Sequence, residues 1–364
     1  MKIPHPPFFL FGMGNRRKLL YKGGVLYDAS TGEMLRSWKV LHEQIIPHEY
    51  TVRWQSREGK QYTIQEDETG VCLMVEGTRT YLTGNHLQLP DFKSGEPGLF
   101  GNSHSQLMRV LLHEVLINIA DGKPYANFLV RAAPGYRDAA IICEALRRTG
   151  NLELAKDWIL GLTEPFDGAR EGEREPDNLG QILFLISLVS DKEHPLVARV
   201  LEEAETFRCT DYVTGNTDGA EHPVYQTKWL KFGLKSLGLP DDWHLPPSYD
   251  PYAAVFWLDY RDVPTGGPPF SEKVKDANPH LAWAEAHFHA WDPPMDIPTR
   301  TYPLSWGIHS DRDPPLGMGI VSPEFVERRV AVPQARHAAE MLLYFLDYAP
   351  RGAPHPDERL QHAH

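Results

Sequence analysis

The sequence predicts a mainly α protein, an (α/α) barrel of five to six helical hairpins preceded by a small N-terminal antiparallel β unit. Residues 16–92 form short apolar segments separated by turn residues, whereas the apolar spacing beyond 91–101 is helical. Among the predicted helices, nearly all-apolar ones alternate with one-sided ones, as inner and outer helices of a barrel would. The sequence has no fixed repeat period, which argues against a superhelical repeat array. We therefore expect a β-rich unit over 1–100, a barrel domain over 101–349 and a disordered tail over 350–364.

Six strands are expected in the β-rich unit. Each is short and apolar, and Gly-containing turns, such as those at Gly23, Gly59 and Gly70, separate many of them. This regular spacing is typical of antiparallel sheets. The expected strands are 18–21, 25–27, 50–54, 62–65, 71–75 and 79–82.

The rest of the chain is expected to be helical. Apolar residues surround nearly the whole circumference of 177–189, so this helix should be buried on most sides. By contrast, 195–207 carries Arg199 and Glu202 on a polar side and should face solvent. The expected helices are 103–120, 136–148, 152–162, 177–189, 195–207, 224–237, 251–259, 279–289 and 336–348.

Composition excludes several function classes. The 364 residues carry 37 Lys and Arg against 49 Asp and Glu, a formal charge of −12 without a long basic cluster, which argues against nucleic-acid partners. No run of about 18 apolar residues predicts a membrane span, and the early apolar run 8–11 is too short for a signal peptide. Three scattered cysteines form neither a disulfide framework nor a zinc site. We expect a reduced, cytoplasmic protein.

The starts of three predicted inner helices are unusually polar. If these helices are inner staves of one barrel, their N-terminal ends converge on one face and line one pocket. Each residue also has a structural interpretation, because Asp177 and Asn178 are common N-cap residues and Arg137 can pair with Asp138. Their recurrence at the same structural position favours a binding site. The candidates are Tyr136, Arg137 and Asp138 on the first helix, Asp177, Asn178 and Gln181 on the second, and Tyr225, Gln226 and Trp229 on the third.

Aromatic residues accompany these helix starts and the loops near them. The chain has nine Trp and fifteen Tyr, and Trp306 lies in a Pro-rich connecting segment. Aromatic faces beside carboxylates and amides suit sugar rings, whose C–H groups stack while their hydroxyls take directional hydrogen bonds. The same side chains also serve as core residues, and the sequence leaves both roles open. Trp306 is included among the candidate sugar-binding residues.

Three short motifs resemble the glucoamylase-like six-hairpin glycosidases. Segment 136–140 resembles the Arg-Asp-Ala element that opens an inner helix of that family and binds the terminal sugar. Segment 177–181 is similar to the acidic, Gly-containing start of the family's next inner helix. Segment 322–325, ahead of the last inner helix at 336–340, resembles the loop that carries the catalytic base. The resemblance extends over roughly 103–349 in helix order, with motifs about three to five residues long.

The resemblance implies roles for individual residues. Arg137 and Asp138 would bind sugar hydroxyls, Glu221 would be the general acid and Glu324 the base, at the separation of about 6.5–9.5 Å that inversion requires. Glu221 departs from the family because it follows Gly-Ala instead of lying in a Trp-Glu context. The other candidate carboxylates are therefore Glu175, Asp211, Asp218 and Glu327.

These observations predict a glycoside hydrolase that acts on a small glycoside or oligosaccharide without a metal or cofactor. Segment 12–16 lacks the complete dinucleotide fingerprint, and His287 and His289 point in different directions on a helix. A non-catalytic sugar-binding or scaffold protein is one alternative. The β-rich unit either supplies a loop to the pocket or mediates homo-oligomer formation. A polysaccharide lyase or sugar epimerase is the other alternative, with Tyr212, His222, Tyr225 and His309 as candidate bases.

Overall fold

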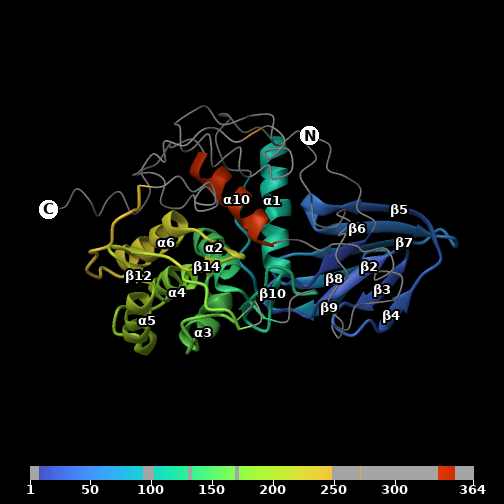
Figure 1. The fold of residues 1–364 in the computed structure, drawn as a ribbon. Helices are drawn as coiled ribbons and strands as arrows, with labels where there is room; N and C mark the ends of the chain where they lie inside the picture. The colour runs from blue at the N-terminus through green and yellow to red at the C-terminus, as the bar shows by residue number, and fades with distance from the viewer. Residues whose placement is uncertain are drawn as a thin grey trace.

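The computed structural model describes residues 8–92, 102–129, 133–168, 172–247, 271 and 335–348. A β-rich unit and a group of helices lie side by side, and helix α1 (Asn102–Ile117) lies between them (Figure 1). Buried residues of both parts belong to one continuous hydrophobic core. In the described part of the chain, no helix is both long enough and apolar enough to cross a lipid bilayer.

Two antiparallel sheets form the β-rich unit. One has the strand order β1-β2-β3-β4 and the other β5-β6-β7-β8-β9. Tyr21 of the first sheet packs against Trp54 of the second with their ring centroids 5.2 Å apart, so the apolar faces share a core. The strands are β1 (Phe9–Phe11), β2 (Leu19–Lys22), β3 (Val25–Asp28), β4 (Met34–Ser37), β5 (Val40–Ile46), β6 (Thr51–Ser56), β7 (Gln61–Glu66), β8 (Gly70–Val75) and β9 (Thr78–Gly84), with the 3-10 helix η1 (Pro47–Glu49) before β6.

The six strands expected from the sequence are confirmed as β2, β3 and β6 to β9. Strands β1, β4 and β5 were not expected. The edge strand β5 carries the polar residues His42, Glu43 and Gln44 in its middle, which hides the apolar alternation of a strand.

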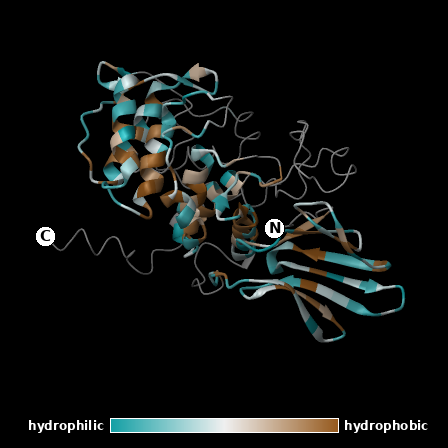
Figure 2. Cartoon of the chain, turned by 90° about the horizontal axis from the view of Figure 1, so that it is seen from below, coloured by the Kyte–Doolittle hydropathy of each residue, from teal (hydrophilic) through white to brown (hydrophobic). Residues whose placement is uncertain are grey.

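Seven α-helices lie in the described ranges, and the described residues confirm all the expected helices except 251–259 and 279–289, which fall outside those ranges. The helix 177–189 is buried on all sides over most of its length, as expected, and 195–207 buries one side only. Hydrophobic residues gather where helices face one another (Figure 2). The further helices are α2 (Tyr136–Arg148), α3 (Glu153–Leu160), α4 (Asp177–Ser187), α5 (Pro195–Thr206), α6 (Pro223–Ser236) and α10 (Ala335–Tyr348).

The prediction of an (α/α) barrel of hairpins is wrong. Helices α1, α10, α2, α4 and α6 pack side by side in that order, while α3 and α5 contact α4 from outside this row. Two sheets of four and five strands and three two-stranded hairpins complete the described architecture. Alternating burial distinguishes covered from outer helices, but a row of helices with outer helices against it gives the same pattern as a closed ring. The sequence pattern therefore could not establish closure.

Two glycines set the spacing between α4 and α6. A Cβ atom on Gly180 would lie 2.0 Å from the carbonyl carbon of Trp229, and one on Gly233 would lie 2.6 Å from the carbonyl oxygen of Gly180. The two backbones therefore approach more closely than any side chain would allow. This contact joins the beginning of α4, where polar residues gather, to the middle of α6.

A buried ionic network anchors the segment between β1 and β2. Glu66 accepts hydrogen bonds from the backbone N–H groups of Gly12 and Met13, and it pairs with Arg16 at 3.1 Å. Lys18 donates to the carbonyls of Gly12 and Gly14. Burial lowers the pKa of Lys18 to about 7, although the nearby Glu66 carboxylate opposes this shift.

Helix α1 docks on the β-rich unit through aromatic rings. The His113 ring stacks on Phe9 with centroids 4.9 Å apart, and Tyr50 lies at the same centroid distance on another side. The Tyr50 hydroxyl donates to the carbonyl of Arg109, and the N–H of Gly14 donates to that of Leu116. Burial lowers the pKa of His113 to about 3, so the imidazole is neutral near pH 7. The sheets and the helices are therefore held together by α1.

Candidate functional site

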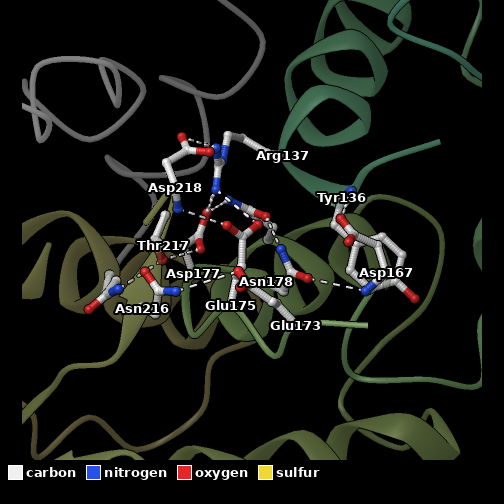
Figure 3. A network of polar contacts seen from close by, with 12 residues as sticks. Tyr136, Arg137, Asp167, Glu173, Glu175, Asp177, Asn178, Asn216, Thr217 and Asp218 are labelled. Atoms are coloured by element: carbon white, nitrogen blue, oxygen red, sulfur yellow. Dashed lines mark hydrogen bonds and ion pairs between the residues drawn. The ribbon is translucent and has the colours of Figure 1, made fainter. Parts of the chain in front are cut away.

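The N-terminal ends of α2, α4 and α6 converge on one polar cluster (Figure 3). A two-stranded hairpin, β14 (Asn216–Thr217) and β15 (Ala220–Glu221), precedes α6 and reaches the same place. The other short hairpins are β10 (Ile119–Ala120) with β11 (Lys123–Pro124), and β12 (Arg208–Cys209) with β13 (Tyr212–Val213).

Arg137, in the first turn of α2, is the centre of this cluster. Its Nη1 lies 2.7 Å from Oδ2 of Asp218, and its Nη2 lies 2.9 Å from Oδ2 of Asp177 and 3.3 Å from Oε2 of Glu175. The guanidinium group is planar and charged over the whole accessible pH range, so three carboxylates around it fix its orientation. We call Arg137, Glu175, Asp177 and Asp218 the Arg137 cluster.

A layer of buried amides and hydroxyls holds Asp177 in place. Its Oδ2 accepts from Nε2 of Gln181 at 2.7 Å, and its Oδ1 accepts from the Thr217 hydroxyl at 2.8 Å. Thr217 also accepts from Nε2 of Gln226, and Asn178 donates to Gln181. Every one of these side chains is buried. They position Arg137 and do not present polar atoms to solvent.

A tight turn brings Asp218 to Arg137. Asp218 and Gly219 form the two-residue loop between β14 and β15, and both have positive φ, +56° and +85°. An Asp-Gly pair with two positive φ values is the preferred chemistry of such a hairpin loop. The backbone N–H of Asp218 donates to Oε1 of Glu175 at 2.9 Å, which secures the turn against the start of α4. This Asp-Gly pair is the sequence signal that would have ranked Asp218 above Glu221.

A second ion pair lies on the α10 side of the cluster. Nη1 of Arg336, in the first turn of α10, is 3.7 Å from Oδ1 of Asp138, and its Nε donates to Oε1 of Glu340 at 3.1 Å. Although burial disfavours the charge of Arg336, Glu340 and Asp138 raise its pKa overall, and Tyr225 and Arg137 are also within electrostatic range. Arg336 was not among the residues expected to bind ligand.

Most of the expected binding residues are buried where they converge. Trp229 packs against Phe184 and Phe232, and the Tyr225 ring faces the Arg137 guanidinium at 5.9 Å. The Tyr136 hydroxyl donates to the carbonyl of Glu164, and burial raises its pKa. The candidates with a partly exposed side chain in this group are Arg137 (12%), Asp218 (21%) and Asp138 (26%).

Of the two expected catalytic residues, the described part of the chain includes Glu221 alone. Glu221 is exposed on β15, where it is opposite Asn216 in the hairpin, and none of the contacts described here joins it to the Arg137 cluster. Glu324 and Trp306 fall outside the described residues, as do the alternatives Glu327 and His309. Asp211 lies 3.5 Å from His244. Tyr212 is paired with Cys209 in the β12–β13 hairpin, and His222 directly precedes α6.

The charge of the site limits what it can bind. Two guanidinium groups, Arg137 and Arg336, face five carboxylates on Asp138, Glu175, Asp177, Asp218 and Glu340, a formal charge of −3. Such a surface repels anionic ligands and offers acceptors to hydroxyl or ammonium groups. In the described ranges, no group of three or more His, Cys, Asp or Glu side chains has a geometry that could hold a metal ion.

Comparison with protein-family profiles, with curated proteins and with solved structures found no match to this chain.

Proposed function

We propose that the protein is a carbohydrate-active enzyme of the glycoside hydrolase type and that the Arg137 cluster binds a sugar ring of a neutral glycoside. The observation that supports this most is the orientation of Arg137 by three carboxylates, from the segment just before α4, the first residue of α4 and the β14–β15 hairpin. Neighbouring charged donors and acceptors at fixed positions match the adjacent hydroxyls of a sugar, each of which both donates and accepts. Arg137, Asp138 and Asp218 are the side chains that would touch the ligand.

The buried layer behind Arg137 supports a binding role. Gln181 and Thr217 both donate hydrogen bonds to Asp177, and Gln226 donates to Thr217. These bonds fix Asp177, so the guanidinium that pairs with it is held in place before a ligand arrives. A preorganised group loses little conformational freedom on binding and adds more to affinity than a mobile one. This arrangement explains why the polar helix starts recur in the sequence although most of them cannot reach a ligand.

Hydrolysis further requires a carboxylic acid that donates a proton and a carboxylate that activates water. The oxygens of Asp177, Asp218 and Glu175 that face Arg137 accept hydrogen bonds, which fits ligand binding or the base role and not proton donation. In this proposal Glu221 remains the candidate acid and Glu324 the candidate base. Asp218, on the same hairpin as Glu221, is the candidate base within the described residues.

The acidic character of the site disfavours a lyase. A polysaccharide lyase needs a cationic or amide group that neutralises the carboxylate of a uronate, next to a Tyr or His base. Here both arginines are already paired with carboxylates, and the Tyr225 side chain is buried. A uronate would have to displace these pairs and would meet an excess of negative charge.

The test measures release of reducing sugar from α- and β-linked neutral oligosaccharides and from uronate-containing ones. Wild type is compared with Arg137→Lys, Asp218→Asn, Glu221→Gln and Glu324→Gln, and with Arg199→Lys as the control, since Arg199 pairs with Glu164 on the exposed surface. We expect release from neutral substrates, loss of at least about 100-fold with the acid variant, and an unchanged control.

Two outcomes would contradict this assignment. Cleavage of uronate substrates with formation of an unsaturated product would establish a lyase. Binding of neutral sugars without any release, lost in Arg137→Lys, would establish the non-catalytic sugar-binding alternative, which the pairing of Arg137 with three carboxylates also suits.

A further inference from the structure

The helix α10 supplies the second arginine of the site, although it follows α6 by about a hundred residues in the sequence. It packs between α1 and α2, and the N–H of its first residue, Ala335, donates to the carbonyl of Ala126 at 2.7 Å. This anchor places the first turn of α10 beside the first turn of α2. Arg336 therefore meets Asp138 through tertiary packing, although it follows Asp138 by 198 positions in the sequence.

Arg336 is held firmly by its own helix. Glu340, one turn later, is buried and accepts from Nε of Arg336 at 3.1 Å, and its other oxygen lies 3.4 Å from Nδ1 of His337. An (i, i+4) pair whose carboxylate is buried leaves the long arginine side chain little freedom. The free end of the guanidinium then points to Asp138, with Nη1 to Oδ1 at 3.7 Å.

Asp138 is more accessible than Arg336. About 26% of its side chain is exposed, against 12% of the Arg336 side chain, the same fraction as for Arg137. At 3.7 Å the pair acts mainly through charge, so one oxygen of Asp138 is oriented while the carboxylate keeps acceptor capacity for a ligand. Arg137, the neighbour of Asp138 in the chain, is fixed independently by the three carboxylates of its cluster.

We propose that Arg336 is a positioning residue of the sugar site, which holds the Asp138 carboxylate in the orientation that accepts a sugar hydroxyl, with Glu340 as its buried counter-ion. The inference rests on the proposed function because it assigns Asp138 to the ligand. Arg336 itself acts through Asp138 and does not contact the substrate.

The experiment is a double-mutant cycle on the Michaelis constant. Wild type, Asp138→Asn, Arg336→Lys and the double variant are assayed with 4-nitrophenyl α- and β-glycosides of neutral hexoses and with neutral oligosaccharides, using the substrate that wild type turns over fastest. Lysine keeps the charge but cannot reach Asp138 and Glu340 together with one planar fork. Arg147→Lys is the matched control, because Arg147 also pairs with a buried glutamate of its own helix, Glu144, at the far end of α2.

We expect each single variant to raise KM by about 10-fold with kcat within about threefold of wild type, because the lost interaction is made in both ground and transition states. The double variant should have a KM no higher than that of Asp138→Asn, because Arg336 works through the same carboxylate. Arg147→Lys should leave KM unchanged. If Arg336→Lys fails to fold by circular dichroism, Arg336→Gln/Glu340→Gln, which removes both charges, takes its place in the cycle.

The outcomes separate the inference from the proposed function. An active wild type whose KM is unaffected by Arg336→Lys, or losses that multiply in the double variant, would overturn the positioning role and leave the hydrolase assignment intact. If wild type turns over none of these substrates, the dissociation constants of neutral monosaccharides, measured by calorimetry, replace KM in the double-mutant cycle. A wild type that neither cleaves nor binds any of them would overturn both.

Discussion

The two halves of the molecule each contain an arginine paired with one or more carboxylates, but they use it differently. In the β-rich unit, Arg16 and Glu66 are completely covered, and Arg16 also donates to the backbone carbonyls of Asp67, Glu68 and Asn85. At the helix starts, the Arg137 cluster keeps part of Arg137 exposed. The first network has no atom left for a ligand, whereas the second combines a buried support with an accessible edge.

The exposure of the arginine therefore distinguishes an ion pair that stabilises the fold from one that can bind a ligand. A buried ion pair with saturated hydrogen bonds fixes chain geometry, and breaking it leaves an uncompensated charge inside the protein. A pair that is open on one side can exchange water for ligand without disturbing its support. We therefore expect substitutions in the two networks to differ in kind, with large losses of stability in the first and large losses of ligand binding in the second.

The largest loss of stability is expected for Glu66→Gln. Arg16 would remain buried without its carboxylate, and one of the two backbone N–H groups that Glu66 binds would lose its acceptor. We expect the free energy of unfolding in urea to fall by about 3–5 kcal/mol with sugar binding by the folded fraction unchanged. The control is Glu49→Gln, which breaks an exposed pair with Arg53 and should cost at most about 0.5 kcal/mol. Equal losses in the two variants would contradict the interpretation.

A somewhat smaller loss of stability is expected for Gly180→Ala, at the contact between α4 and α6, whose side chains support the Arg137 cluster. The added methyl group would collide with the Trp229 backbone, so α4 and α6 would have to separate. We expect about 2–3 kcal/mol of destabilisation and a weakened sugar affinity, because Asp177 and Gln226 move apart. Gly84→Ala is the control, since its nearest neighbour would be 3.4 Å away. A Gly180→Ala protein as stable as wild type would show that the helices are not in this close contact.

The pH dependence of the free energy of unfolding tests the buried network of Arg16, Lys18 and Glu66 in the β-rich unit. Between pH 7 and the ordinary pKa of about 10.5, Lys18 is neutral in the folded state and protonated in the unfolded state. The unfolded state therefore binds more protons, and stability should rise with pH by about 1 kcal/mol per unit from pH 7 to 9. Lys18→Met should flatten this slope, whereas Lys156→Met, at an exposed residue of α3, should not. The comparison is made by urea unfolding at pH 7, 8 and 9, and parallel slopes for Lys18→Met and wild type would refute it.

The smallest effect on stability is expected for Asp218→Asn, at the open edge of the Arg137 cluster. Asparagine still fits the positive φ of the turn, and Arg137 keeps two carboxylates, so the loss should be below about 1 kcal/mol. Sugar binding or turnover should nevertheless fall by at least about 10-fold. Asp177→Asn, at a buried residue behind Arg137, should lower the free energy of unfolding by about 1–3 kcal/mol and also weaken sugar binding. The cluster would be purely structural if Asp218→Asn destabilised the fold while ligand binding stayed intact.

Local patterns in the sequence were sufficient for many elements. The expected strand 71–75 is β8 within one residue, because a short continuous apolar run lies between two Gly-containing turns. Helix α2 has the expected bounds, because its apolar spacing begins at Tyr136 and ends before Thr149-Gly150. The edge strand β5 was missed because its polar middle hides the apolar alternation. Closure of a barrel was wrongly inferred, since burial of single helices does not specify how the helices are arranged around one another.

The sequence by itself determined that polar residues open α2, α4 and α6, because helix starts, turns and apolar spacing depend on neighbours within a few positions. Only the tertiary structure decided which of them reach the surface. Arg137 meets Asp177 and Asp218 across 40 and 81 positions, and Arg336 meets Asp138 across still more. Such contacts depend on how closely the helices pack, and here the glycine contact between α4 and α6 and the place of α10 beside α2 set that distance.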